Sequence, residues 1–371
     1  MKRIFLLCAF PFLLTSCHVG RFFIYNFANI HDYKKFKNTE IDGSVEPFKF
    51  HHGNGQIEIG APKYDLKGKS DLDAFNAEHK SVAFLIIQND SIQYEWYANK
   101  YDTSTILTSF SMAKSYISAL VGIAVQEGHI KSIEDPITDY IKGFKNDGFE
   151  KITIEHVLNM RTGIDYVENY YSPFGNVAIG YYGRDLERHL SKLKIKEEPD
   201  KKFDYISIAT QILGKVVENA TGKSISEYCE EKLWKKIGTE YDASWSLDKK
   251  GGLEKAFCCL NARATDYAKF GRLYLNGGKW GEEQVVPAEW VEKSTKKTEK
   301  SKDSWYAYQW WHMPEEENGK LKRDVDFYMQ GHLGQYVYME PEKNLIVVRL
   351  GKNRDKVYWD GLLKELVDHV E

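Results

Sequence analysis

Residues 110–128 read FSMAKSYISALVGIAVQEG, and apolar side chains recur at helical spacing along this segment. We predict a helix over 111–127, because Gly128 is a residue type that commonly ends helices. Its first turn contains Ser-x-x-Lys at 111–114, which places a hydroxyl and an amine on one face of the helix. The apolar positions that define the helix are Ile117, Leu120, Val121, Ala124 and Val125.

Ser111 and Lys114 have the chemistry of a nucleophile and its base. A serine hydroxyl is a poor nucleophile unless a neighbouring base takes its proton. A lysine can take that proton only if burial or a nearby cation destabilises its ammonium form. The apolar neighbours Phe110 and Met112 favour burial of Lys114, and free backbone N–H groups at a helix start can stabilise an oxyanion. Ser-x-x-Lys alone is a weak signal, so the prediction depends on the rest of the chain.

Two later segments contain polar residues that such a site would need. Phe-Asp-Tyr-Ile-Ser at 203–207 lies at the start of a predicted helix over 206–220. Gly-His-Leu-Gly at 331–334 opens a predicted strand over 335–339. The three segments therefore follow one another as helix start, helix start and strand start.

In this order and on these elements, the segments resemble the three motifs of the penicillin-recognising serine hydrolases. The stretch 154–163 is also similar to that family, and the resemblance covers about residue 80 to the C-terminus. It implies an acyl-enzyme mechanism. Ser111 would attack a carbonyl, while Lys114 and Tyr205 would share the proton transfers. Which of these two is the general base stays open, because their titrations should be coupled.

The resemblance also implies roles in substrate binding. Ser207 would orient Lys114 or the substrate amide, and the backbone N–H groups of Ser111 and Gln335 would form the oxyanion hole. His332 and Gly334 belong to the third motif beside the substrate. His332 stands where β-lactam-hydrolysing relatives carry Lys, and a histidine is mostly neutral at pH 7, which suits a β-lactam carboxylate less well.

Details around the second motif resemble the esterase and 6-aminohexanoate-dimer hydrolase branch of the class C β-lactamase-like enzymes. These details are Ser207 in place of Asn and the segment Gly-Ile-Asp-Tyr-Val-Glu-Asn-Tyr at 163–170. In that branch Tyr170 would contact the scissile amide, and the aromatic cluster 305–311 would be either pocket wall or core. The expected function is hydrolysis of a small ester or amide. The alternatives are a β-lactamase or D-alanyl-D-alanine carboxypeptidase and, less favoured, a non-catalytic envelope binding module.

The predicted strands lie at the two ends of the chain. Segments 81–88 and 92–97 alternate apolar and polar residues, as expected of a sheet covered on one side. Segments 335–339 and 344–350 flank a hairpin signal. We therefore expect an α+β fold of the β-lactamase/transpeptidase-like type, in which an antiparallel sheet is flanked by terminal helices and a mostly helical region is inserted.

The composition limits the classes of protein to which the chain can belong. The chain has 371 residues, a formal net charge of -3 and 42% hydrophobic residues, which allow two or three domains with a sizeable core. The balanced charge gives no reason to expect nucleic-acid binding. The sequence contains no phosphate-binding loop and no zinc-binding motif, so neither a cofactor nor a metal is expected.

The first residues have the composition of an export signal. Lys2 and Arg3 precede an apolar run over 4–14, which is too short to cross about 30 Å of hydrocarbon as a helix. Leu-Thr-Ser-Cys at 14–17 resembles a bacterial lipobox, in which Cys17 would carry the lipid. The alternatives are an ordinary signal peptide with an incidental cysteine or an uncleaved anchor. We expect an exported lipoprotein of the cell envelope.

The resulting domain prediction has three parts: a signal peptide at 1–17, a tether and connecting segment at 18–70, and a serine hydrolase domain at 71–371. Aromatic residues over 21–27 would pack either on the body or on a membrane surface. The remaining cysteines are Cys229 and the adjacent pair 258–259, and we expect structural thiols, because adjacency in sequence disfavours a simple bridge.

Overall fold

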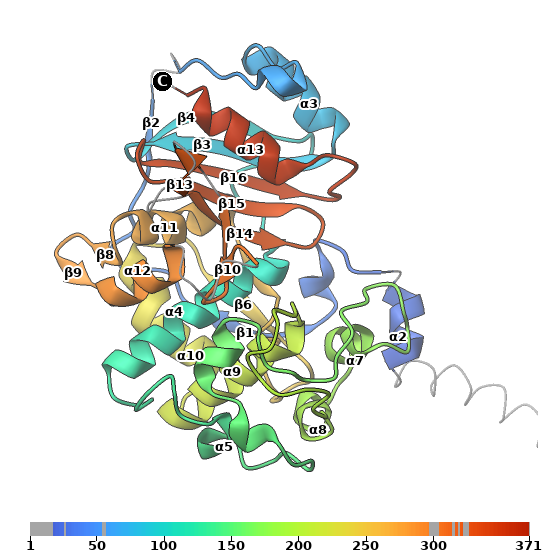
Figure 1. Cartoon of the computed structure of the whole chain (residues 1–371). Coiled ribbons are helices and arrows are strands. Elements are labelled where there is room, and N and C mark those ends of the chain that lie inside the picture. Colours follow the sequence, from blue (N-terminus) through green and yellow to red (C-terminus); the bar gives the residue numbers. More distant parts are fainter. Residues whose placement is uncertain are drawn as a thin grey trace, which may run out of the picture.

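An eight-stranded sheet is the largest element of the computed structural model, which describes residues 18–25, 27–53, 57–296, 304–313, 316–317, 320–321 and 326–370 (Figure 1). Its neighbouring strands run antiparallel, except that β2 and β4 are parallel. β16 pairs with β3, which confirms one sheet built from distant segments. In order across the sheet, the strands are β10 (Tyr306–Ala307), β11 (Trp310–Met313), β14 (Asp326–Gly331), β15 (Gln335–Glu340), β16 (Leu345–Gly351), β3 (Ser81–Gln88), β4 (Ser91–Tyr97) and β2 (His51–His52).

Strand β3 is buried on both faces of the sheet, from its first residue to Ile87. Phe84 and Ile86 join an apolar core with helices α3 (Lys69–Glu78) and α13 (Trp359–Asp368). Leu85 and Ile87 belong to a larger core on the opposite face. The prediction that these strands are covered on one side is therefore wrong for β3, because helices lie on both faces.

Helix α11 (Ala264–Leu275) covers this opposite face closely. A Cβ atom at Gly271 would lie 2.9 Å from the Met339 sulfur and 3.1 Å from Val337 Cγ1. The glycine therefore allows the helix backbone to approach β15.

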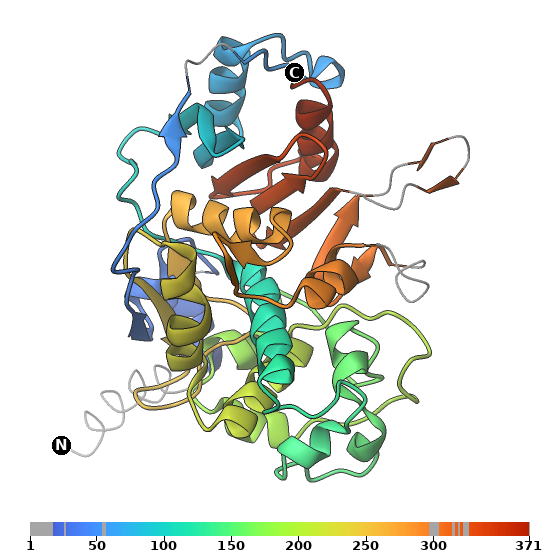
Figure 2. The same cartoon turned by 90° about the vertical axis from the view of Figure 1, so that its left-hand side faces the viewer.

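The inserted region is helical, as predicted, and α4 (Ala113–Gln126) runs through its centre. Figure 2 shows α4, in teal, leading from the sheet into the helical region. A 3-10 turn over Phe110–Met112 precedes α4 and contacts β14 and β15. The start of α4 consequently lies where the sheet meets the helices. The other helices of this region are α5 (Ile137–Tyr140), α6 (Ile154–Leu158), α7 (Asn176–Tyr182), α8 (Leu186–Ser191), α9 (Ser207–Thr221), α10 (Ile225–Cys229) and α12 (Ala288–Thr295).

Residues 18–70 pack onto the body along much of their length. Helix α2 (His18–Tyr25) contacts α7, and β1 (Lys37–Ile41) pairs with β6 (Ala243–Leu247). A second sheet has the order β1, β6, β7 and β5, and two hairpins are formed by β8 with β9 and by β12 with β13. These strands are β5 (Leu107–Thr108), β7 (Leu260–Ala262), β8 (Lys279–Trp280), β9 (Glu283–Gln284), β12 (Glu316–Glu317) and β13 (Lys320–Leu321).

Several predicted helices differ from the observed ones at their ends. The predicted helix over 111–127 is a 3-10 turn followed by α4, and the predicted helix over 206–220 is α9, shifted by one residue. Residues 224–237 form α10, a π-helical turn and a 3-10 turn, and α10 begins with a capping box in which the Ser224 side chain accepts from the Glu227 N–H. Within the described residues, no helix is both long and apolar enough to span a bilayer. The predicted leader with Cys17 lies outside those residues.

Candidate active site

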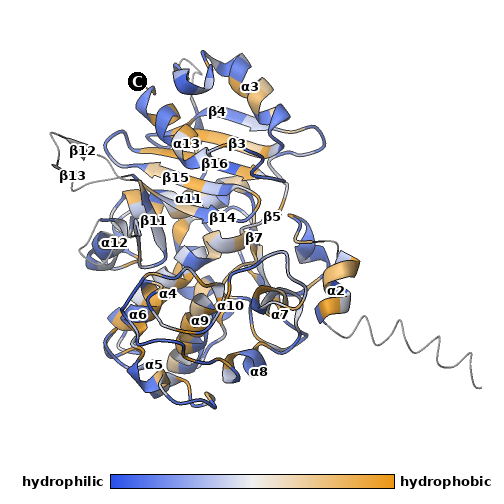
Figure 3. Cartoon of the chain, turned by 45° about the vertical axis from the view of Figure 1, so that its right-hand side comes forward, coloured by the Kyte–Doolittle hydropathy of each residue, from blue (hydrophilic) through white to orange (hydrophobic). Residues whose placement is uncertain are grey.

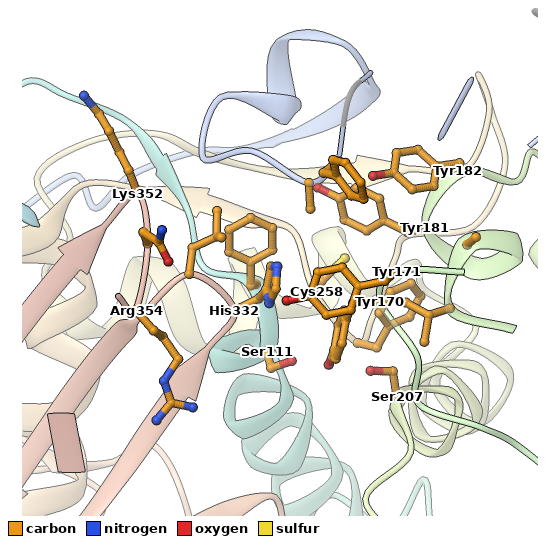
Figure 4. Close-up of a pocket in the computed structure, with 18 of the residues that line it drawn as sticks. Ser111, Tyr170, Tyr171, Tyr181, Tyr182, Ser207, Cys258, His332, Lys352 and Arg354 are labelled. Atoms are coloured by element: carbon orange, nitrogen blue, oxygen red, sulfur yellow. The ribbon is translucent and has the colours of Figure 1, made fainter. Parts of the chain in front are cut away.

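A cavity of about 500 Å³ opens between the sheet and the helical region (Figure 4). Its wall includes four of the residues singled out in the sequence: Ser111, Tyr170, Ser207 and His332. In Figure 4, His332 comes from the sheet side, whereas Tyr170 and Ser207 come from the helical side. The structure thus brings the three motifs to one cavity.

Lys114 lies beneath Ser111 and is 1% exposed. Its Nζ lies 3.0 Å from Ser111 Oγ, 3.3 Å from Ser207 Oγ and 2.8 Å from the carbonyl oxygen of Phe257. Burial lowers the pKa of Lys114 to about 8, and the nearby Glu168 carboxylate opposes that shift. Near pH 8 a substantial fraction of Lys114 is therefore neutral, and the amine must be neutral to accept the proton of Ser111.

Glu168 was not predicted as a site residue, and the structure places it under the second motif. One of its carboxylate oxygens accepts from Ser207 Oγ at 2.5 Å and from the Tyr170 hydroxyl at 2.7 Å. The other oxygen accepts from the Ser207 N–H at 2.8 Å. The sequence feature that could have identified Glu168 is its position two residues before Tyr170, an expected active-site tyrosine in a loop.

The hydroxyl of Ser207 therefore donates to Glu168 and can only accept from Lys114. The carbonyl of Phe257 can also only accept. A neutral lysine has two N–H bonds and one lone pair, so these two acceptors use both N–H bonds. The lone pair is left for the proton of Ser111.

Tyr205 is packed in an aromatic cluster and lies close to both members of the catalytic pair. Burial raises its pKa above the usual range, and a hydrogen bond with Ser111 opposes the shift. Lys114 Nζ is 5.4 Å from the centre of its ring. Tyr205 is therefore a protonated phenol at neutral pH.

The cluster 305–311 supports Tyr205 from behind. Trp311 stacks on its ring with centroids 5.5 Å apart, and Tyr306 meets the ring edge-on at 5.7 Å. Tyr306 and Trp310 are almost fully buried, at 1% and 0% exposed. Of the two interpretations left open by the sequence, the structure favours core over pocket wall.

His332 presents an uncharged ring to the cavity. It stacks on Tyr170, with centroids 4.8 Å apart and an angle of 7° between the rings. Burial lowers its pKa to about 4, and the positive charge of Arg354 adds to this effect. The imidazole is consequently neutral at pH 7.

The turn between β14 and β15 lies against the backbone that leads to Ser111. A Cβ atom at Gly331 would lie 2.3 Å from the carbonyl oxygen of Ser109, so only glycine permits this approach. Gly334 has a φ of +81°, and its carbonyl accepts from Arg349 Nη1 at 2.6 Å. The Gln335 side chain donates to the Gly351 carbonyl at 2.7 Å, and neither Gly334 nor Gln335 is among the residues that line the cavity.

Cys258 and Cys259 form a disulfide beside Phe257, and Cys258 lines the cavity. The prediction of thiols is wrong for this pair. Adjacent residues can be bridged here because Cys259 adopts a φ of 72°, in the left-handed region. Cys229 is a buried thiol, as predicted.

Two cationic residues stand on the strand side of the cavity. Lys352 and Arg354 follow β16 and line the wall near His332 (Figure 4). Arg354 is paired with Asp360 at 3.5 Å. Both could face an anionic part of a ligand.

The chain is similar to a family model, to curated proteins and to solved structures. A family model described as Beta-lactamase matches residues 70–357. The chain is 26% identical over 317 residues to a 6-aminohexanoate-dimer hydrolase of Paenarthrobacter ureafaciens, covering 79% of this chain and 78% of that protein. It is 28% identical over 191 residues to a "Putative D-alanyl-D-alanine carboxypeptidase" of Salmonella schwarzengrund, covering only 45% and 44%.

Among solved structures, "Putative 6-aminohexanoate-dimer hydrolase from Bacillus anthracis" is similar with a TM-score of 0.75 and 22% identity, covering 92% of each chain. This similarity confirms the β-lactamase/transpeptidase-like fold that the three motifs implied.

Proposed function

Since the chain belongs to the Beta-lactamase family, we propose that it is a serine hydrolase that cleaves a small ester or amide through an acyl-enzyme on Ser111. The observation that carries this proposal is the set of hydrogen bonds around Lys114. Two obligate acceptors take its N–H bonds, and its lone pair faces the serine.

In the first half of the reaction, Ser111 Oγ attacks the carbonyl carbon while its proton passes to Lys114. The backbone N–H groups of Ser111 and Gln335 stabilise the negative oxygen. The bond to the leaving alcohol or amine then breaks. Tyr205, which is protonated and hydrogen-bonded to Ser111, relays the proton to that leaving group.

In the second half, water attacks the acyl carbon and restores the hydroxyl of Ser111. Lys114 accepts the proton of that water and returns it to Ser111 Oγ as the acyl bond breaks, and the acid product leaves. In this proposal Lys114 is the general base in both halves, and Tyr205 passes the proton to the leaving group.

For the substrate, we propose a linear amide or ester with a carboxylate at one end. The similarity to the 6-aminohexanoate-dimer hydrolase supports a small dimer of an amino acid as the kind of molecule that is cleaved. The neutral ring of His332 offers no charge beside Ser111, whereas Lys352 and Arg354 stand on the same wall and would bind the carboxylate.

A D-alanyl-D-alanine carboxypeptidase or β-lactamase is the second candidate, supported by the partial similarity to the carboxypeptidase. It would share the attack by Ser111 and differ in the fate of the acyl-enzyme. A non-catalytic module is not favoured, because Ser111, Lys114 and Tyr205 are all present and in contact.

The catalytic assignment is tested with a serine-directed fluorophosphonate probe. Wild type should be labelled and Ser111→Ala should not. Ser115→Ala is the matched control, because Ser115 lies on the same helix and donates to the Gln309 carbonyl, away from the cavity. Unlabelled wild type, or equal labelling of Ser111→Ala, would refute the proposal.

The substrate class is tested with a short nitrophenyl ester, a linear amide dimer and a chromogenic cephalosporin. We expect turnover of the first two. Fast turnover of the cephalosporin relative to the ester would favour a β-lactamase. A long-lived penicilloyl adduct would favour the carboxypeptidase.

We further propose that the chain works outside the cytoplasm, held by a lipid on Cys17. The disulfide between Cys258 and Cys259 supports an oxidising compartment. Cys17→Ser should move the protein from the membrane fraction to the soluble fraction. Retention in membranes would refute the lipid anchor.

A further inference from the structure

The segment that follows Cys17 has two different sides. Helix α2 is fixed to the body by Phe22, which is 3% exposed and packs on Tyr182 with centroids 5.3 Å apart. The next two residues point outward: Phe23 is 66% exposed and Ile24 is 57% exposed. Figure 3 shows hydrophobic colouring on α2 at the margin of the molecule, beside α7.

Other exposed apolar side chains extend this surface, which we call the aromatic face. Phe27 is 48% exposed and lies against Tyr171, with ring centroids 6.4 Å apart. Phe174 follows on the same loop and is 75% exposed. Most large hydrophobic side chains in a folded protein are covered, so a contiguous exposed group marks an interaction surface. The aromatic face comprises Phe23, Ile24, Phe27, Tyr171 and Phe174.

A basic groove of about 230 Å³ adjoins α2 and is lined by Tyr25 of that helix. Among its lining residues Asp248 is the one acid, and it accepts from the N–H groups of Leu186 and Leu253. Its exposed cations are Lys37, Arg184, Lys249, Lys250 and Lys35, of which Lys35 is paired with Asp32 at 2.8 Å. The formal charge of the whole chain is -3, so this concentration of positive charge is local.

We propose that the aromatic face and the basic groove dock on the surface of an anionic lipid bilayer. Aromatic and aliphatic side chains enter the interfacial layer, while lysines and arginines attract anionic headgroups. The 17 residues before α2 include the apolar run 4–14 and Cys17. The proposed membrane anchor is either the lipid on Cys17 or the apolar run 4–14. In both cases the anchor lies shortly before His18, the first residue of α2.

This orientation has a consequence for the active site. Phe27 and Tyr171 belong to the aromatic face and also line the cavity of Ser111. The mouth of the cavity therefore opens at the bilayer surface, where amphiphilic substrates concentrate. This consequence rests on the proposed hydrolase function, whereas the docking itself does not.

The test measures vesicle binding by a chain that lacks the proposed membrane anchor. Both apolar cores are formed by residues from Phe22 to Val370, so the chain 18–371 retains every core residue. Its folding is verified by circular dichroism and a thermal melt. Binding is then measured by co-sedimentation with vesicles of phosphatidylethanolamine and phosphatidylglycerol, and with vesicles of phosphatidylcholine alone.

We expect the wild type to bind the anionic vesicles, and we expect this binding to weaken as salt is added. Its affinity for the neutral vesicles should be at least about 10-fold lower than its affinity for the anionic ones. Phe23→Ser/Ile24→Ser should lower the partition coefficient at least about 10-fold. Lys249→Gln/Lys250→Gln should lower it specifically for anionic vesicles. Neither variant changes a residue that lines the cavity, so both should hydrolyse a soluble ester like the wild type.

Two matched controls should bind like the wild type. Val45→Ser/Tyr358→Ser removes apolar side chains that are 92% and 62% exposed elsewhere. Lys131→Gln/Lys142→Gln removes two exposed lysines near α5. Absence of binding by wild type, or equal losses in control and test variants, would overturn the proposal. So would self-association abolished by Phe23→Ser/Ile24→Ser, because the face would then be a contact between copies of the chain.

Discussion

At the scale of single residues, Lys114 combines its proposed use as a base with an energetic cost to the folded state. Burial lowers its pKa from 10.5 to about 8, so the folded chain binds this proton less tightly than the unfolded chain. Below about pH 8 this costs the folded state about 3 kcal/mol. Stability is regained as the pH rises from about 8 towards 10.5, where the unfolded chain is still protonated and the folded chain is not.

Replacing Lys114 with Met should abolish catalysis without destabilising the fold. We expect ester hydrolysis to fall at least about 100-fold, because the base is lost. The melting temperature at pH 7 should stay the same or rise, because a buried charge is removed. Lys255→Met is the control, since Lys255 is also buried but donates to the Tyr181 carbonyl outside the catalytic pair, and this variant should keep Ser111 reactive.

Glu168 should set the pH at which Lys114 becomes active. Activity expressed as kcat/KM should rise with pH up to about 8, as Lys114 loses its proton. The carboxylate of Glu168 stabilises the ammonium form, so Glu168→Gln should move this rise to lower pH. It should also lower kcat, because Gln holds the Ser207 hydroxyl less firmly. The titratable groups that face Lys114 and Glu168 are Tyr166, Tyr170 and Tyr205, and burial raises the pKa of each, so all three phenols stay protonated and neutral over this pH range.

The control for this profile is Glu134→Gln, which removes an exposed carboxylate in the helical region. Its pH profile should coincide with that of the wild type. If kcat/KM of Glu168→Gln rises over the same pH range as that of the wild type, the Glu168 carboxylate does not affect the pKa of Lys114.

At the scale of elements, the short segment before β7 contains Phe257, whose carbonyl accepts a hydrogen bond from Lys114. Trp245 donates its indole N–H to the carbonyls of Lys255 and Cys258, at 3.0 and 2.9 Å. The disulfide between Cys258 and Cys259 restrains the same segment directly after Phe257. The position of the Phe257 carbonyl therefore depends on both restraints.

Cys258→Ser/Cys259→Ser should lower kcat by about 10-fold while the protein remains folded, because the Phe257 carbonyl is less well positioned. Steady-state hydrolysis of the nitrophenyl ester measures this change. Cys229→Ser is the control, since Cys229 is a buried thiol on α10. Unchanged kcat in the double variant would show that the hydrogen bonds of Trp245 suffice.

At the scale of the whole molecule, the N-terminal segment is part of the body and of the site. β1 pairs with β6 along its whole length, and the side chain of Ser246 donates to Asn38 at 2.7 Å. Phe27 and Ala28 line the cavity. A chain that begins at the predicted start of the hydrolase domain lacks both contributions.

Deleting residues 18–43 from the chain 18–371 should therefore reduce stability and activity together. We expect a fall in melting temperature of several degrees and increased aggregation, because deletion exposes the edge of β6. Differential scanning calorimetry and ester hydrolysis measure both effects. A fully active deletion variant with an unchanged melting temperature would show that this segment is only a tether.

The sequence was sufficient for four strands of the large sheet and for the three motifs, because these depend on local patterns. Apolar runs marked β3, β4, β15 and β16, and the residue types at 111–114, 203–207 and 331–334 marked the cavity. Glu168 was not predictable as a site residue, since its contacts with Ser207 join distant segments. The disulfide was missed because a bridge between neighbours depends on the φ of one residue, Cys259.

The pairing of β16 with β3 also governs when the enzyme can exist during synthesis. Residues 345–351 supply the neighbour that joins β3 to β15, and they are synthesised after both of these strands. Until then the hairpin of β3 and β4 and the strand β15 each have an open edge. Such long-range pairing slows folding. Under the proposed function, a nascent chain that ends before residue 345 would already contain Ser111 and still be inert, so hydrolysis would begin only after β16 has been made.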